Sequence, residues 1–150
     1  MLDLGTVDWF RQGACPLMAW ALVEQAARHD LGWQLAIIGD AVDWGDWWHM
    51  GAITPDHTYF IDAGGAAQVD EVCEQWHREH RQRRHPGHDT GLSAVKDVFL
   101  QLLWPDPRTA DEHTRQVTLE FAAQILAAEG FLPCPRAAPA GSGDGGPAEA

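Results

Sequence analysis

Several features that mark large classes of protein are missing from this chain of 150 residues. It has no run of 18 apolar residues, which excludes a segment apolar enough to cross a membrane. Its N-terminus has no basic region followed by an apolar stretch, so we expect no secretory signal. Its three cysteines form no Cys-x-x-Cys pair, which excludes a disulfide framework and makes a reducing, cytoplasmic location the expectation.

Basic residues are also scarce, with 10 Lys and Arg against 22 Asp and Glu and a net charge of −12. Such a chain repels phosphate backbones and anionic membranes, so we expect neither nucleic acid nor a membrane as a partner. One basic run opposes this trend, at Arg78, Arg81, Arg83 and Arg84. Basic residues at a helix end complement the helix dipole, and docking of an acidic partner on these four arginines is the alternative.

The composition is otherwise that of one globular domain, with 45% hydrophobic and 21% charged residues. Residues 133–150 are rich in Pro, Ala and Gly, so we expect a single domain over 1–132 followed by a disordered tail. Tryptophan is abundant, and three of the eight, Trp44, Trp47 and Trp48, fall within five positions. Three so close cannot all point inward from one strand, so we expect one or more of them to line a cleft.

Local patterns predict an α+β domain in which helices pack on an antiparallel sheet. The expected elements are a helix at 16–29, strands at 33–38, 47–54 and 58–62, a helix at 66–83, a short apolar helix or strand at 92–103, and a last helix opened by a capping box at 109–112. The turn at 54–57 joins the second and third strands into a hairpin.

The first predicted helix carries a cysteine at its start. Proline is favoured at the first helical position, so Pro16 places Cys15 at the N-cap. The N-terminus of a helix stabilises an anion such as a thiolate, and its free N–H groups are suited to hold an oxyanion. Gly13 lets a substrate approach closely, and Gln12 adds a side-chain donor. Cys15 is therefore the candidate nucleophile, with Gln12, Gly13 and the three clustered tryptophans as candidate oxyanion and substrate-binding residues.

The hairpin offers a base for this nucleophile. If its turn is centred between Pro55 and Asp56, His49 lies directly opposite Asp62, close enough for a carboxylate to orient an imidazole. An odd-length turn would break this register. A thiol at a helix start with His and Asp on adjacent strands is the arrangement of a nucleophile, its base and the residue that orients the base.

These segments resemble small papain-like cysteine-hydrolase domains of bacteria and phages, which share a core with transglutaminase-like and arylamine acetyltransferase proteins. The resembling stretches run from Gly13 to Leu22, from Trp33 to Ile38 and from Tyr59 to Gly65, together with His49 and Thr54-Pro55-Asp56.

The resemblance implies a papain-like α+β fold in which Cys15 is the nucleophile, His49 the base and Asp62 the residue that orients it. It implies a thiol-dependent hydrolase or acyltransferase of the peptidase, amidase or deamidase type. Its substrate would be a protein, peptide or small amide with an amide, isopeptide or thioester bond, and neither a cofactor nor a metal is implied. The sequence departs from the pattern twice: Pro16 follows the cysteine where a polar or aromatic residue is commoner, and His57 stands where the turn usually has glycine.

Other interpretations stay open at this point. Cys15 is also compatible with a small core residue, His49 with a buried structural histidine, and Asp62 with a turn residue. The protein would then be a non-catalytic interaction protein of a phage, plasmid or toxin system. A zinc-binding protein is the second alternative, suggested by a cluster in sequence of Cys73, His77, His80, His85, His88 and Asp89.

Overall fold

A computed structural model describes residues 7, 9–10, 13–80, 87–103 and 105–132 of the chain. The expected tail at 133–150 and the candidate residue Gln12 lie outside the described residues. The helices are α2 (Cys15–Arg28), α3 (Val69–His80) and α4 (Glu112–Ala128). The strands are β1 (Gln34–Asp40), β2 (Trp47–Ile53), β3 (Tyr59–Asp62), β4 (Gly65–Gln68) and β5 (Thr90–Val95). Short 3-10 helices follow at η1 (Trp44–Asp46), η2 (Asp97–Leu102) and η3 (Pro107–Thr109).

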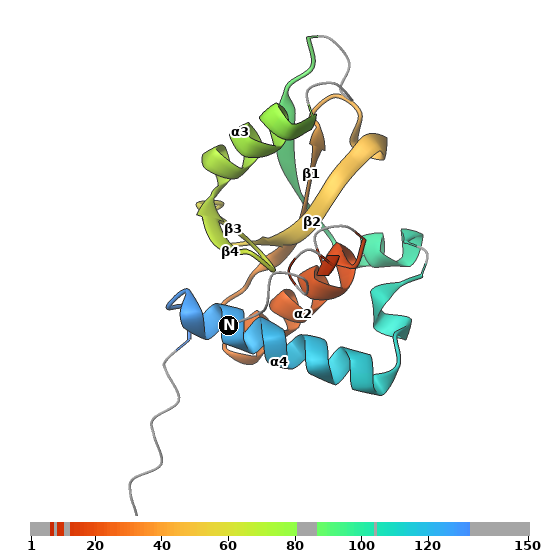
Figure 1. The fold of residues 1–150 in the computed structure, drawn as a ribbon, viewed down its shortest axis with the longest axis vertical. Coiled ribbons are helices and arrows are strands. Elements are labelled where there is room, and N and C mark those ends of the chain that lie inside the picture. Colours follow the sequence, from red (N-terminus) through yellow and green to blue (C-terminus); the bar gives the residue numbers. More distant parts are fainter. Residues whose placement is uncertain (1–6, 8, 11–12, 81–86, 104, 133–150) are drawn as a thin grey trace, which may run out of the picture.

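The strands form one antiparallel sheet in the order β4-β3-β2-β1-β5. Strand β1 is buried along its length after the first residue, as its apolar, β-branched sequence predicts, and it pairs with both β2 and β5. Figure 1 shows α3 on one side of the sheet and α2 with α4 on the other. The expected α+β class with an antiparallel sheet is therefore confirmed.

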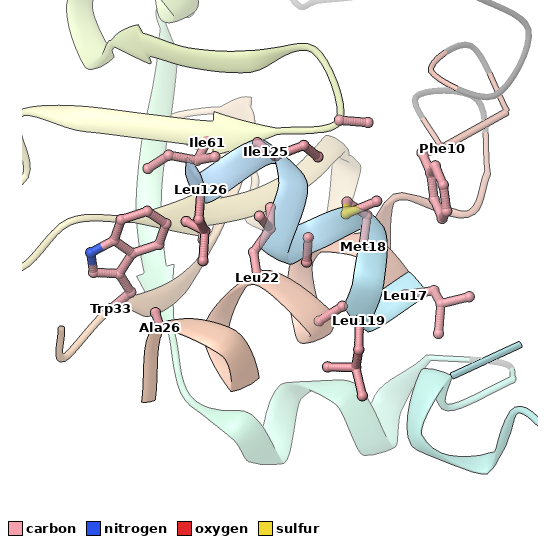
Figure 2. Packing of buried hydrophobic residues seen from close by; sticks show 14 residues of the cluster. Phe10, Leu17, Met18, Leu22, Ala26, Trp33, Ile61, Leu119, Ile125 and Leu126 are labelled. Carbon is pink, nitrogen blue, oxygen red and sulfur yellow. The ribbon is translucent and has the colours of Figure 1, made fainter. Parts of the chain in front are cut away.

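The largest apolar cluster lies between α2, α4 and the sheet (Figure 2). Leu22 of α2, Leu126 of α4 and Ile61 of β3 are all fully buried in it. One polar bond crosses the helix pair, where Nε2 of the buried Gln25 donates to the carbonyl oxygen of Leu119 at 2.9 Å. Because an unpaired buried amide costs about 1–3 kcal/mol, this bond favours one docking position of α4 on α2.

The structure corrects the predicted helix at 66–83. Residues 65–68 form β4, in which Ala66 pairs with Ile61 and Ala67 with Phe60, and the helix begins only at Val69. The helix preference of alanine is less than about 1 kcal/mol, so pairing with a sheet edge overrides it. Helix α3 is described as far as His80, and the expected extension to residue 83 lies outside the described residues.

Two further predictions are changed in detail. The segment at 92–103 divides into β5 and η2, because residues 90–95 add a strand to the edge of β1. The capping box at 109–112 is wrong: Asp111 is the N-cap of α4, and its Oδ1 accepts from the Thr114 N–H at 2.9 Å. Thr109 Oγ1 instead donates to the Asp106 carbonyl oxygen at 2.7 Å. In the part of the chain that the structure describes, no helix is long and apolar enough to cross a membrane.

Candidate active site

Cys15 is the first residue of α2, and Ala14 rather than Cys15 is the N-cap. The prediction was displaced by one position because proline is tolerated at the second helical position as well as the first, both of which have N–H groups without intrahelical acceptors. The cysteine side chain is 6% exposed and packs with Leu35 and Met50 of the sheet. The thiol thus lies at the positive end of α2 and against strands β1 and β2.

His49 and Asp62 meet, as the sequence predicts. The His49 ring in β2 is 1% exposed, and its Nε2 lies 2.8 Å from Asp62 Oδ2 at the end of β3. The second oxygen of Asp62 accepts from the Gly64 N–H at 2.8 Å. Both carboxylate oxygens are therefore used, so Asp62 stabilises the turn and is fixed against the histidine by the same geometry.

The predicted hairpin register is wrong by two residues. The strands pair Ala52 with Ile61 and Ile53 with Phe60, and continuing this register places Gly51, not His49, opposite Asp62. The turn is centred between Asp56 and His57, one residue further along the chain than expected. His57 adopts a left-handed φ of 59°, the conformation that explains why glycine is common at this position.

This register error leaves the His49–Asp62 contact intact. Side chains alternate between the faces of a sheet with a period of two, so a shift of two residues keeps both on one face. Diagonal neighbours lie within reach of a long side chain. Glycine at position 51 leaves room for the Phe60 ring, because a Cβ atom there would collide with it. The centroid of that ring lies 5.9 Å from the centroid of the His49 ring.

The environment of His49 favours its protonated form. Burial by itself lowers its pKa, but hydrogen bonding and charge from Asp62 and from Cys15 together outweigh burial and raise the pKa to about 9. With Nε2 on Asp62, the ring presents Nδ1 to the thiol. Nδ1 is buried and has no hydrogen-bond partner of good geometry among the described residues. Catalytic hydrogen bonds are often long or poorly aligned before substrate binds.

A stack of aromatic rings holds His49 from the side of α3. Trp76 lies parallel to the His49 ring with centroids 4.7 Å apart and an interplanar angle of 17°. The His80 ring also stacks on Trp76, with centroids 4.7 Å apart, and on Trp48, with centroids 5.1 Å apart. His80 was a candidate ligand of the suggested zinc cluster, and Trp76 was not among the candidate site residues. The signal for their shared role is the spacing of four residues, which places both on one face of α3.

A bulge in β2 separates the three clustered tryptophans. His49 pairs with Ile38 and Trp47 with Gly39, so Trp48 is an extra residue in the strand. The bulge brings Trp48 to the stack beside His49, while Trp47 packs with the apolar residues around Cys15. Trp44 also packs with that cluster.

A groove of about 770 Å³ lies at the start of α2. Gly13, Ala14 and Pro16, which flank the nucleophile candidate in sequence, line it, and Trp47 lines it from β2. Gly13 is exposed, and a Cβ atom there would meet nothing within 4 Å, so the approach to this turn is open. Of the candidate substrate-binding residues, Gly13 and Trp47 line the groove, whereas Trp44 and Trp48 do not.

The residues of the suggested zinc cluster are not brought together. His77 Nδ1 lies 3.0 Å from Thr90 Oγ1, and His88 Nδ1 lies 2.7 Å from Asp40 Oδ2. Across the described residues, no three His, Cys, Asp or Glu side chains are arranged to hold a metal ion, and His85 lies outside them. Of the basic run, Arg78 is exposed and lies 3.5 Å from Glu74, and the other three arginines fall outside the described residues.

No protein-family model matches the chain, and neither a curated protein nor a solved structure does. Any function is therefore inferred from the geometry of Cys15, His49 and Asp62 themselves.

Proposed function

We propose that the protein is a thiol-dependent hydrolase or acyltransferase with a papain-like arrangement, acting on an amide, isopeptide or thioester carbonyl. The observation that carries this proposal is the buried His49 ring, held by Asp62 at 2.8 Å and acted on by the Cys15 thiol. A histidine that only filled the core would be more stable neutral, because burying a charged ring costs free energy. A strongly perturbed group beside a nucleophile is a common property of active sites.

The proposed resting state is an ion pair. With a pKa of about 9, His49 is an imidazolium at neutral pH. In this proposal the imidazolium and the positive end of α2 stabilise negative charge on the reacting sulfur, because the thiolate is the nucleophilic form of a cysteine.

In the first step, the Cys15 thiolate adds to the substrate carbonyl carbon and forms the C–S bond. The tetrahedral intermediate collapses, the bond to the leaving group breaks, and the leaving group takes the proton of His49. The products are a thioester on Cys15 and a neutral His49. Asp62 holds the ring through Nε2, which leaves Nδ1 as the ring nitrogen that gives up the proton.

In the second step, water or an acceptor amine attacks the thioester. Neutral His49 takes a proton from the attacking group, the C–S bond breaks, and the Cys15 thiolate is restored beside a protonated His49. Water gives hydrolysis and an amine gives acyl transfer, so the choice depends on which of them reaches the thioester first.

The oxyanion has one backbone donor in this turn of α2. Leu17 and Met18 donate their N–H groups to the Ala14 carbonyl oxygen at 3.1 and 3.3 Å, and Pro16 has no N–H. The N–H of Cys15 is therefore the donor that the described part of the turn offers. A single donor in a site of this kind contributes roughly 10²–10³ in rate, so a second donor from the substrate or from outside this turn would complete the site.

Alkylation by iodoacetamide tests the proposal without knowledge of the substrate. Rates are measured at pH 6 by mass spectrometry of the peptides that contain Cys15 and Cys73. We expect Cys15 to react at pH 6, whereas burial and the charge of Asp70 raise the pKa of Cys73 and keep that thiol unreactive. The His49→Gln variant should lose the reactivity of Cys15 at pH 6, and His113→Gln, an exposed position on α4, is the matched control.

The opposite result favours the non-catalytic alternative. If Cys15 does not react at pH 6, or if it reacts equally in wild type and His49→Gln, the imidazole does not activate the thiol. The three residues would then form a structural contact in an interaction protein.

A further inference from the structure

The groove at the start of α2 is apolar although three polar residues line it. Asp106 is bound by Arg108, whose Nη2 donates to Oδ2 at 2.7 Å and holds the pKa of Asp106 below its ordinary value. Thr109 Oγ1 donates to the Asp106 carbonyl oxygen at 2.7 Å, and Thr114 Oγ1 donates to Asp111 Oδ2 at 2.6 Å. The polar side chains of the lining therefore already have partners.

The remaining lining is apolar or backbone-rich. Trp9, Leu17, Trp47, Leu103, Pro105 and Pro107 are among the residues that form it. Leu103 and Trp47 also pack with the apolar cluster that contains Cys15, so these two side chains contact both that cluster and the groove. A volume of about 770 Å³ is within the range of small-molecule sites and much larger than one short side chain needs.

The position of the base decides which part of a substrate this groove receives. His49 has to protonate the leaving group, so the leaving group must lie on the side of the thiol where His49 lies. Neither His49, nor Asp62, nor any residue of α3 lines the groove. Cys15 itself does not line the groove, but its sequence neighbours Ala14 and Pro16 do. The groove therefore lies at the start of α2, away from the residues that hold the base, and is the space available to the acyl part that stays on Cys15 after the leaving group departs.

We propose that this groove binds a large apolar acyl group, so that the substrates are amides or thioesters of long aliphatic or aromatic acids. This inference rests on the proposed function, because it assumes that Cys15 is acylated. The net charge of −12 disfavours an anionic acyl group, and among the described lining residues no polar side chain is left without a partner to bind one.

The test compares p-nitrophenyl acetate with p-nitrophenyl octanoate, using release of p-nitrophenolate and the mass of the acylated chain. Each buried methylene raises transition-state binding by up to about fourfold. Since the groove is open to solvent, we expect about twofold for each of the six additional methylenes, or a kcat/KM for octanoate roughly 60-fold above that for acetate. The Cys15→Ala variant supplies the blank for spontaneous hydrolysis.

Two neighbouring leucines give a matched pair of variants. Leu103 lines the groove, whereas Leu102 is 78% exposed. Leu103→Trp should fill the groove and lower the octanoyl-to-acetyl ratio about tenfold, and Leu102→Trp should leave the ratio at the wild-type value. If Leu103→Trp fails to fold by circular dichroism, Thr109→Trp narrows the groove from an exposed position and should lower the same ratio.

The outcomes separate the two proposals. A thioester on Cys15 with both esters, but no preference for octanoate or an equal effect of Leu102→Trp and Leu103→Trp, overturns the acyl-binding groove and leaves the thiol mechanism standing. Failure to form an acyl-enzyme with either ester overturns both.

Discussion

The two sides of the sheet bury very different residues. On the side of α2 and α4, the largest cluster holds fourteen buried apolar residues (Figure 2), and the polar side chains buried on these two helices, Gln25 and Thr118, are uncharged. On the side of α3, the buried set includes His49, which is stacked on Trp76 and paired with Asp62. Apolar burial stabilises a fold by about 25 cal/mol per Å², whereas a buried ionisable group costs free energy unless it is paired. Burial on the first side thus stabilises the fold. Burial of His49 on the second side costs free energy, which its pairing with Asp62 offsets.

Cys15 connects the two sides because it begins α2 while its thiol acts on a histidine that α3 covers. A substitution on one side should therefore change one property and leave the other nearly intact. The predictions that follow test this separation.

The largest effect is expected for Cys15→Ser. A hydroxyl gains little from an imidazolium and a helix terminus, so the rate of acyl-enzyme formation should fall by about 10³-fold or more. The thermal midpoint should stay within a few degrees of wild type, because the change creates no cavity. Activity close to wild type would show that another residue carries the reaction.

The next effect belongs to the apolar side. Leu126→Ala removes a fully buried side chain between α4 and α2 and should lower the free energy of unfolding by about 2–5 kcal/mol in urea titrations. The alkylation rate of Cys15 per folded molecule should not change. The control is Leu102→Ala, at an exposed leucine of η2, which should lower the free energy of unfolding by less than about 0.5 kcal/mol.

Asp62→Asn should have an intermediate effect on activity. The amide keeps the size of the side chain but no longer offers a charge to His49, so turnover should fall about 10- to 100-fold. The loss should be smaller than the roughly 10⁴-fold known for a serine triad, because an ion pair of thiolate and imidazolium depends less on its third member. An unchanged pH profile of alkylation would mean that Asp62 does not influence the histidine.

The pH dependence of turnover should reflect His49. A raised pKa means that the proton is retained to higher pH, so His49 protonates the leaving group at neutral pH and loses this ability as pH rises through about 9. We expect kcat/KM to fall on the alkaline side near this value. In Asp62→Asn the fall should begin at lower pH, because one of the two groups that raise the pKa is gone. A histidine that titrates near 6.5 in wild type by NMR would contradict this.

The smallest effect is expected at the aromatic stack. Trp76→Leu removes the ring that lies 4.7 Å from His49, and aromatic pairs contribute about 0.5–1.5 kcal/mol beyond their buried area. Turnover should fall about 3- to 10-fold, with the alkaline limb of the pH profile displaced. Tyr59→Leu, at an exposed ring on β3, is the control, and an equal loss there would show that the effect is general destabilisation.

Much of the fold could be predicted because the signals are local. Pro16 marks the start of α2, the apolar run of β1 has the length and residue types of a buried strand, and the turn at 54–57 joins two strands. The pairing of His49 with Asp62 was also accessible, since it depends on alternation along the strands and not on the register itself.

Other features depend on contacts that are distant in sequence. The alanines of β4 have no local tendency to form a strand, and they do so because β3 offers an unpaired edge. The bulge that sends Trp47 and Trp48 to different neighbours arises from pairing with β1. The stack of Trp76 and His80 on His49 requires that α3 lies across the sheet.

The sequence by itself determined the α+β class, the helix that carries Cys15, and the hairpin that carries His49 and Asp62, because periodicity, proline and turn residues act within a few positions of the chain. Only the tertiary structure decided the register of that hairpin, the raised pKa of His49 and the apolar groove at the start of α2. Each of these features depends on burial and on contacts between elements that are far apart in the sequence. No single local pattern of residues therefore predicts them.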